Sequence, residues 1–378
     1  MNRKNILIAN GILFALLIYT SCNRYKLTGH YIDPASKNYI ESPFDIFDSI
    51  VCTPLETTDQ SIFTEASKTI YDKGLYYILD KYTFQILVFN EDGHFERKIN
   101  RLGRGPQEYY DTEDFIINPM TGNIEVSSSF QGTINEYNKQ GEFISKYAIG
   151  HRAVHYFFPI NHDLIAAYSE SDNGLFMVYS KSKQKIVNSI ETSKDFLNYN
   201  TIYKCYKSPF FYNQDEQELL FIDAPNKKVY TVSSEGELAL KYAFNFGQYD
   251  CDPFKLSPNQ TSEYYYKENE DYKKIYNLFF FAENDNQIIL AYKYLVFPGM
   301  NFTFINKKTD QMINLDKNSQ MTLLPFDYLN HNCGIFVVSP DVVEKCVHRE
   351  WLDSTTIARL DALPIDANPV IIKYYFKH

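Results

Sequence analysis

One short segment, residues 103–109, combines side chains that recognise polar ligands with a backbone free enough to present them. It reads GRGPQEY, so a guanidinium, a carboxylate and a phenol lie close together in the chain. Gly103 and Gly105 can adopt backbone angles that are closed to other residues, and Pro106 stiffens the turn. We therefore expect this segment to project charged groups toward a polar ligand such as a glycan or a peptide.

Two later segments offer similar side-chain types. His151 and His155 are four residues apart, but the segment has no helical pattern, so this spacing does not indicate a metal site.

A second interpretation of the segment at 103–109 is structural, because Arg104 and Glu108 could instead pair with neighbouring repeats and hold them together. The candidate ligand-binding residues are Arg104, Glu108, Tyr109, His151, Arg152, His155, Tyr249 and Asp250.

Catalytic signatures are missing from the sequence. It holds no Gly-x-Ser-x-Gly elbow, His-Glu-x-x-His motif, P-loop or dinucleotide fingerprint. A zinc site could combine His331 and Cys333 with Cys346 and His348, since residues i and i+2 of a strand share a face. The second pair falls in a predicted helix, where such residues diverge. We therefore predict no metal and no cofactor, and a binding protein rather than an enzyme.

The elements that must position these residues repeat along the chain. Residues 75–99 contain two short strands, the turn sequence Asn-Glu-Asp-Gly and a third strand. Asp-Gly between such runs predicts a tight hairpin, because type I′ turns need positive φ at both central residues. Related hairpins follow at 133–147, 175–190, 227–242 and 302–315. The residues before the five turns, in steps of 48, 42, 53 and 73, are Asn90, Asn138, Ser180, Ser233 and Asn306.

Another strand pair precedes each hairpin, which makes the repeating unit four-stranded. Units of about 40 to 50 residues with four short antiparallel strands are typical of a β-propeller. Five units span residues 66–315. A sixth combines strands at 324–329, 333–338 and 370–376 with 49–55 from the other end of the chain, which removes an open sheet edge. The predicted fold is an all-β, six-bladed β-propeller closed by N- and C-terminal strands, with helical insertions at 259–277 and 340–360.

Three segments carry a resemblance to a known family. GRGPQEY at 103–109, VCTPLETT at 51–58 and NPVIIKYYF at 368–376 resemble the six-bladed β-propeller proteins that are mostly lipoproteins of Bacteroides-type bacteria, distantly similar to NHL-repeat propellers. The resemblance covers residues 45–378 and implies fold and export, with little chemistry. Connections between blades lie on one face around the channel, so the candidate residues are expected at the channel mouth.

The propeller fold also leaves an enzymatic alternative open. Other six-bladed propellers include metal-dependent lactonases, which gather carboxylates and amides in the channel. A metal-dependent hydrolase or lyase is therefore the second functional hypothesis, although strand alternation also explains the residues concerned as ordinary turn and edge positions. If the protein is such an enzyme, the metal ligands in the channel would be Glu113, Asp114, Asn118 and Asn213.

The first 22 residues read as an export signal. Arg3 and Lys4 precede an apolar run at 6–19, which is short for a membrane span, and small residues then lead to Cys22. This order resembles a bacterial lipobox, so we expect lipidation at Cys22 and a membrane contact through the lipid only. The predicted division is a signal peptide at 1–21, a lipidated spacer at 22–44 and the propeller at 45–378. Residues 23–26 lack an acidic run, which favours the periplasmic side of the outer membrane over the cell surface.

The amino-acid composition limits the classes of molecule that the protein can bind. The net charge is −10, and nucleic acids require clustered cations, so we expect no nucleic-acid partner. The 32 Tyr and 29 Phe residues suit packing between blades, and exposed ones can stack on sugar rings. We expect a monomer that binds an unidentified polar small molecule, glycan or protein.

Overall fold

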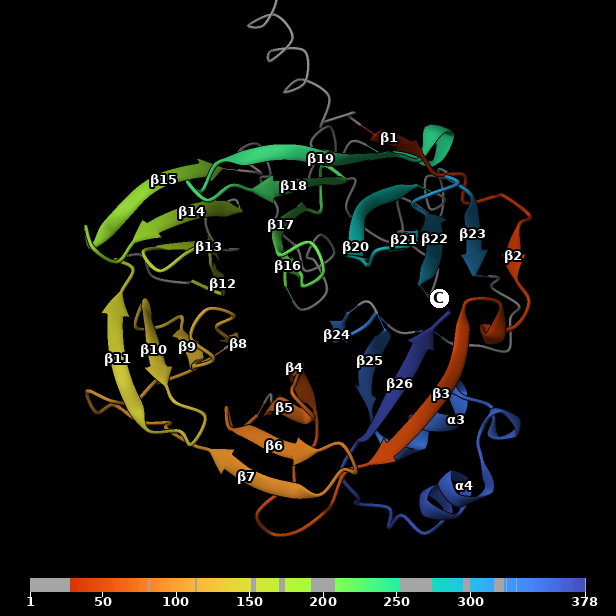
Figure 1. The fold of residues 1–378 in the computed structure, drawn as a ribbon, viewed down its shortest axis with the longest axis horizontal. Helices are drawn as coiled ribbons and strands as arrows, with labels where there is room; N and C mark the ends of the chain where they lie inside the picture. Colours follow the sequence, from red (N-terminus) through yellow and green to blue (C-terminus); the bar gives the residue numbers. More distant parts are fainter. Residues whose placement is uncertain are drawn as a thin grey trace, which may run out of the picture.

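A computed structural model describes residues 28–80, 82–112, 114–150, 154–169, 174–191, 208–251, 274–294, 300–315, 323, 325–330 and 332–377. Their strands form six sheets arranged in a ring around a central axis, as Figure 1 shows. The predicted six-bladed β-propeller is confirmed. Blades are numbered one to six, beginning with the sheet that contains β4.

The first three blades each hold four strands in chain order from the axis outward. Blade one consists of β4 (Ala66–Asp72), β5 (Leu75–Asp80), β6 (Ile86–Asn90) and β7 (Phe95–Ile99). Blade two consists of β8 (Phe115–Ile117), β9 (Ile124–Ser128), β10 (Thr133–Tyr137) and β11 (Phe143–Ala148). Blade three consists of β12 (Tyr156–Pro159), β13 (Leu164–Ser169), β14 (Leu175–Ser180) and β15 (Lys185–Glu191).

The other three blades also contain strands from the N-terminal region. Blade four has β16 (Phe210–Asn213), β17 (Glu218–Asp223), β18 (Lys228–Val232) and β19 (Leu238–Asn245), with β1 (Thr28–Tyr31) outside. Blade five has β20 (Ile275–Glu283), β21 (Gln287–Tyr294), β22 (Asn301–Asn306) and β23 (Met312–Leu315), with β2 (Tyr39–Ile40) outside. Blade six has β24 (Tyr328–Leu329), β25 (Cys333–Val338), β26 (Val370–Phe376) and β3 (Phe47–Pro54).

Connections alternate between the two faces of the ring, because neighbouring strands of a blade run in opposite directions. We call the upper face the one that carries the connections between blades and the turns between second and third strands. The lower face carries the turns between first and second strands and between third and fourth strands.

The turn between third and fourth strands is capped by the residue that ends the third strand. Asn90 Oδ1 accepts hydrogen bonds from the backbone N–H groups of Asp92 and His94, at 3.1 and 3.0 Å. Such bonds stabilise a turn, because the side chain accepts from backbone N–H groups of the turn. Equivalent bonds are accepted by the side chains of Asn138, Ser180, Ser233 and Asn306. The five positions that revealed the repeat in the sequence therefore share one structural role.

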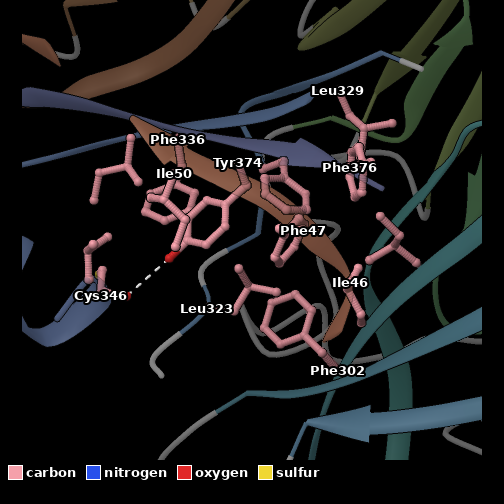
Figure 2. Close-up of a cluster of buried hydrophobic side chains, with 14 of the residues drawn as sticks. Ile46, Phe47, Ile50, Phe302, Leu323, Leu329, Phe336, Cys346, Tyr374 and Phe376 are labelled. Atoms are coloured by element: carbon pink, nitrogen blue, oxygen red, sulfur yellow. Dashed lines mark hydrogen bonds between the residues drawn. The ribbon is translucent and has the colours of Figure 1, made fainter. Parts of the chain in front are cut away.

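The two ends of the chain close the ring, as predicted. β3 pairs antiparallel with β26 along most of its length, and Figure 2 shows the apolar cluster beside them. Phe47 is fully buried, with its ring centroid 4.7 Å from that of Tyr374 and 6.3 Å from that of Phe304 in blade five. The Tyr374 hydroxyl donates to the backbone oxygen of Cys346 at 3.1 Å. Closure therefore rests on a hydrogen-bond ladder and on core packing together.

Part of the predicted spacer forms strands. β1 pairs parallel with β19, from Thr28 opposite Tyr242 to Tyr31 opposite Asn245, and β2 pairs parallel with β23. His30 is buried against the rings of Tyr242 and Phe244, each with a centroid 5.8 Å away. These strands lie on the outer edges of complete sheets, where backbone hydrogen bonds suffice, so no apolar alternation marked them in the sequence.

The described helices are short. They are the 3-10 turns η1 (Pro43–Asp45), η3 (Gly247–Tyr249), η7 (Pro340–Val342) and η8 (Arg349–Trp351), and the α-helices α3 (Val343–Cys346) and α4 (Ser354–Asp361). The insertion predicted at 340–360 is thus helical but broken into pieces. In the part of the chain that the structure describes, no helix is long and apolar enough to cross a membrane.

The other predicted insertion, 259–277, is wrong at its C-terminal end. Residues 252–273, with the tyrosines at 264–266, lie outside the described residues, but β20 already begins at Ile275. Ile275 and Leu278 are fully buried in the core between blades four and five. That burial favours a strand where the charge pattern of the sequence had predicted a helix.

Candidate functional site in the central channel

A cavity of about 600 Å³ lies in the channel of the propeller. Its walls include the innermost strands of five blades, β4, β8, β12, β16 and β24, which surround the axis in Figure 1. It reaches turn residues 118–122, Gln214 and Gln217, all of which belong to the lower face. Small-molecule sites have volumes of roughly 300–1,000 Å³, so a cavity of this size suits a ligand of modest mass.

Aromatic side chains from different blades form much of the cavity wall. The rings of Phe158 in blade three and Tyr212 in blade four are stacked, with centroids 5.0 Å apart and planes at 24°. Across the channel, Tyr71 of blade one meets Tyr328 of blade six edge to face at 6.1 Å. The ammonium group of Lys373 lies 4.4 Å from the Tyr71 ring centroid, a cation–π distance.

Polar groups complete the wall. Gln214 donates from Nε2 to the Tyr328 hydroxyl at 2.9 Å, and burial is the main cause of the raised pKa of Tyr328. The Thr69 hydroxyl is buried, and within the described residues it has no hydrogen-bond partner. The cavity therefore offers ring faces and side-chain amides, which suit an uncharged polar ligand.

A buried ion pair beside the cavity joins three blades. Lys68 of β4 donates to Oδ1 of Asp114, and Oδ2 of Asp114 accepts from the backbone N–H of Phe157 in β12 at 3.1 Å. Burial raises the pKa of the Asp114 carboxyl, and the charge of Lys68 opposes that shift. Because its two oxygens are bonded to the neighbouring blades on either side, this carboxylate holds blades one to three together around the channel.

Sequence comparison assigns the chain to a family. Residues 40–375 match the family described as "Domain of unknown function (DUF4934)". The chain belongs to the DUF4934 family. No curated protein matches the sequence of this DUF4934 chain.

Solved structures similar to the DUF4934 chain share its fold. A Bacteroides fragilis protein described as a "Putative exported protein" superimposes with a TM-score of 0.73 at 15% identity, over 93% of this chain and 100% of its own. A DUF4221 family member from Bacteroides vulgatus has a TM-score of 0.51 at 12% identity, over 90% of this chain and 99% of its own. At such identities the comparison supports the propeller fold alone.

The GRGPQEY segment of the DUF4934 chain connects β7 to β8 on the upper face, opposite the turns that the cavity reaches. Glu108 folds back, so that its Oε2 accepts the N–H of Gly105 at 2.7 Å, and a Cβ on Gly103 would lie 2.0 Å from that oxygen. Tyr109 is fully buried between blades one and two, and its hydroxyl donates to the Phe84 oxygen at 2.7 Å. Arg104 alone of these three candidates is exposed.

The remaining candidates lie on other connections of the same face. Asp250 accepts from Lys227, whose Nζ is 2.9 Å away, and from the Phe246 N–H at 3.0 Å. Tyr249 packs edge to face on Tyr294. His155 is half-buried and extends the pairing of β12. His151, Arg152 and Cys22 lie outside the described residues.

Residues considered for metal binding already have other partners in the DUF4934 chain. Asn118 donates to Glu125 at 2.8 Å, and Asn213 donates to Glu283 at 3.2 Å. Glu113 and His331 lie outside the described residues. Burial raises the pKa values of the Cys333 and Cys346 thiols to about 11, which disfavours the thiolate that zinc requires.

One carboxylate cluster has metal-like spacing. The oxygens of Glu216, Glu218 and Glu283 lie within 4.8 Å of one another. Lys241 contacts all three carboxylates, with its Nζ 2.7 Å from Glu283, and Lys307 contacts Glu216 and Glu283. Two ammonium groups therefore compensate the charge that a cation would otherwise neutralise.

Of the residues named from the sequence for the channel, Asn118 lines the cavity, and a signal for further lining residues exists in the turns. The turn between first and second strands carries an asparagine whose Oδ1 accepts two backbone N–H groups in most blades. These residues are Asn118, Asn161, Asn213, Asn284 and Asn330. The residue before three of them, namely Ile117, Tyr212 and Leu329, lines the cavity.

Proposed function

We propose that this chain is an exported β-propeller that binds a polar ligand of the glycan class in its central channel. The observation that carries the proposal is the cavity of about 600 Å³, to which five blades contribute aromatic and amide side chains. Sugar rings present C–H faces that stack on aromatic rings and hydroxyls that bond to amides. The Phe158–Tyr212 stack and the Gln214–Tyr328 pair supply both kinds of contact.

The composition of the wall favours a glycan over a peptide. Two of the three lysines that line it are already paired, Lys68 with Asp114 and Lys139 with Asp72. A charged ligand would have to compete with these pairs, which is costly where they are buried. A neutral oligosaccharide leaves them in place.

Two observations support export. One is the N-terminal sequence, and the other is the similarity to the Bacteroides fragilis protein described as a "Putative exported protein". We propose that Cys22 carries lipid, so that the propeller is tethered to the outer membrane, on its periplasmic side. Labelled palmitate should enter the wild-type chain and not a Cys22→Ser variant. Added protease should cleave the chain only after the outer membrane is opened.

Ligand binding is tested on the Cys22→Ser chain, which cannot carry the proposed lipid. Neutral oligosaccharides and short peptides are screened, and the best ligand is titrated by calorimetry into Tyr212→Ala and Phe158→Ala variants. Loss of the aromatic stack should weaken binding about tenfold or more, as for other buried aromatic contacts. Val187→Ala is the control, because Val187 is exposed on β15, far out on blade three.

Two results would contradict the proposal. One is binding that is equally strong in the wild-type and both aromatic variants, with melting temperatures showing that they are folded. The other is a screen in which peptides bind with the predicted dependence on Tyr212 and oligosaccharides do not.

A further inference from the structure

Three planar side chains lie in a row on the upper face of blade two. The guanidinium carbon of Arg104 lies 5.1 Å from the ring centroid of Tyr110, and that ring lies 5.8 Å from the ring of Phe130. Phe130 is 76% exposed and Tyr110 is 41% exposed. We call Arg104, Tyr110 and Phe130 the aromatic ledge. Large exposed aromatic rings are costly in water, and together they mark a contact surface.

The Phe130 end of the ledge is held by a single carboxylate. Asp111 accepts hydrogen bonds from the Ser128 hydroxyl at 2.7 Å, from the Ser129 hydroxyl and from the Phe130 N–H at 3.2 Å. These bonds tie the turn between β9 and β10 to the connection that carries Tyr110. An exposed ring on a braced turn loses little conformational freedom when a ligand binds, which favours affinity.

The Arg104 end is braced by its own loop. Glu108 accepts the Gly105 N–H, and the Gly103 N–H donates to the Tyr109 oxygen at 2.9 Å. The backbone polar groups of the loop are therefore largely used within it. The ledge presents ring faces and one guanidinium, with little free backbone for an extended peptide to pair with.

Arg104 adds a positive charge to the ledge. The chain has a net charge of −10, yet within the described residues no carboxylate pairs with Arg104, and its Nη2 reaches only the Tyr110 hydroxyl at 3.4 Å. A guanidinium stacked on a ring keeps its edge donors free for a carboxylate held in two parallel hydrogen bonds.

We propose that the aromatic ledge binds an acidic saccharide, with a sugar ring on Phe130 and Tyr110 and the sugar carboxylate on Arg104. None of the three ledge residues lines the channel cavity, so this site is independent of the proposed channel ligand. A glycan with uronic-acid units supplies both the C–H face and the carboxylate that the three side chains are arranged to meet.

The test uses the Cys22→Ser chain and two defined probes. Tetragalacturonate is the acidic saccharide, and maltotetraose is a neutral one of equal length. Calorimetric titration should show binding of tetragalacturonate that weakens as salt is added, because an exposed ion pair is screened. Maltotetraose should not bind at the ledge.

Variants then locate the site. Phe130→Ala and Arg104→Gln should each weaken tetragalacturonate binding about tenfold or more. Arg104→Lys should recover only part of it, since lysine lacks the planar pair of donors. The matched control is Tyr82→Ala: Tyr82 occupies the corresponding turn of blade one and is 62% exposed, but its hydroxyl donates to Glu65 at 3.1 Å. This variant should bind like the wild-type chain.

The channel variant Tyr212→Ala separates the two sites. It should leave tetragalacturonate binding unchanged, whereas a channel ligand should be indifferent to Phe130→Ala. The ledge proposal is overturned if tetragalacturonate does not bind at millimolar concentration, or if Phe130→Ala and Arg104→Gln bind it as the wild-type chain does. It is also overturned if tetraglutamate binds with the same dependence on these residues and tetragalacturonate does not.

Discussion

Gln214 and Tyr328 are hydrogen-bonded at 2.9 Å, although they belong to blades four and six and are 114 residues apart. The bond lies at the lower end of the channel and connects two blades that are separated by blade five. Tyr328 in turn contacts Tyr71 of blade one. The wall of the candidate ligand cavity thus depends on contacts between blades that are not neighbours.

Replacing Tyr328 by phenylalanine tests this contact. The ring remains and only the hydrogen bonds of the hydroxyl, to Gln214 and Asn330, are lost. The free energy of unfolding should therefore fall by about 1 kcal/mol, because water can replace the partner of the exposed Gln214. Chemical denaturation measures the difference. Gln214→Ala should give a similar value, and a double variant that adds nothing further would show that the two residues act through one bond.

Phe47 should be the most sensitive position of the closing strand. Its ring is fully buried among Tyr374, Phe376 and Phe304, as part of the cluster in Figure 2. Phe47→Ala should lower the free energy of unfolding by about 3–5 kcal/mol, the usual cost of an unfilled aromatic site.

The control for Phe47 lies on the same strand. Val51 of β3 is exposed, so Val51→Ala should change stability by less than about 1 kcal/mol. If the two substitutions had equal effects in denaturant, closure would depend on the backbone ladder and not on the core.

Gly93 should tolerate no side chain. Its φ of +88° is a glycine conformation, and a Cβ would lie 2.3 Å from the backbone oxygen of Pro54 at the end of β3. Gly93→Ala should therefore cost more than backbone strain alone, because blade one would have to separate from the closing strand.

Gly122 is the control position for Gly93, because a side chain there would strain the backbone without a steric clash. It has a similar φ of +74°, but its Cβ would meet only Lys139 Cε at 3.9 Å. Gly122→Ala should cost about 1–2 kcal/mol from strain. Thermal unfolding of both variants gives the comparison, and a Gly93→Ala protein as stable as Gly122→Ala would rule out the collision.

The docking of β1 should weaken in acid. Burial lowers the pKa of His30 below 6.5, and Asp310, 3.4 Å away, only partly opposes this. The neutral imidazole is the form that the folded state favours, so its contribution is complete above pH 6.5 and is lost as the pH falls through the lowered value. Backbone amides of β1 should then exchange faster with solvent at about pH 5 than at about pH 7.5, after correction for intrinsic rates.

His30→Phe is the matched variant, because phenylalanine can pack against Tyr242 and Phe244 without a titrating group. The pH dependence of exchange at β1 should largely disappear in this variant. A wild-type protein whose β1 exchange does not respond to pH would contradict the role of His30.

Local patterns were sufficient for the blades and their turns. Asn90 ends a strand and Asn138 directly follows one, and both cap turns through bonds to residues two and four positions later, so sequence spacing reveals them. Tyr109 shows the limit of such patterns. Its place in a charged loop suggested a ligand contact, but the structure buries it between two blades, because the neighbouring blade covers it.

The amino-acid sequence by itself determined the number of blades, since four-strand units and turn chemistry are properties of contiguous residues. It also indicated the closure of the ring, because the last unit lacks one strand, which residues 49–55 can supply. Only the tertiary structure decided which side chains meet in the channel and on the aromatic ledge. Phe158 and Tyr212 come together through the packing of two neighbouring blades, and Tyr110 and Phe130 come together because Asp111 ties two segments of blade two. No spacing along the chain encodes these distances, because they depend on how the strands and connections pack in three dimensions.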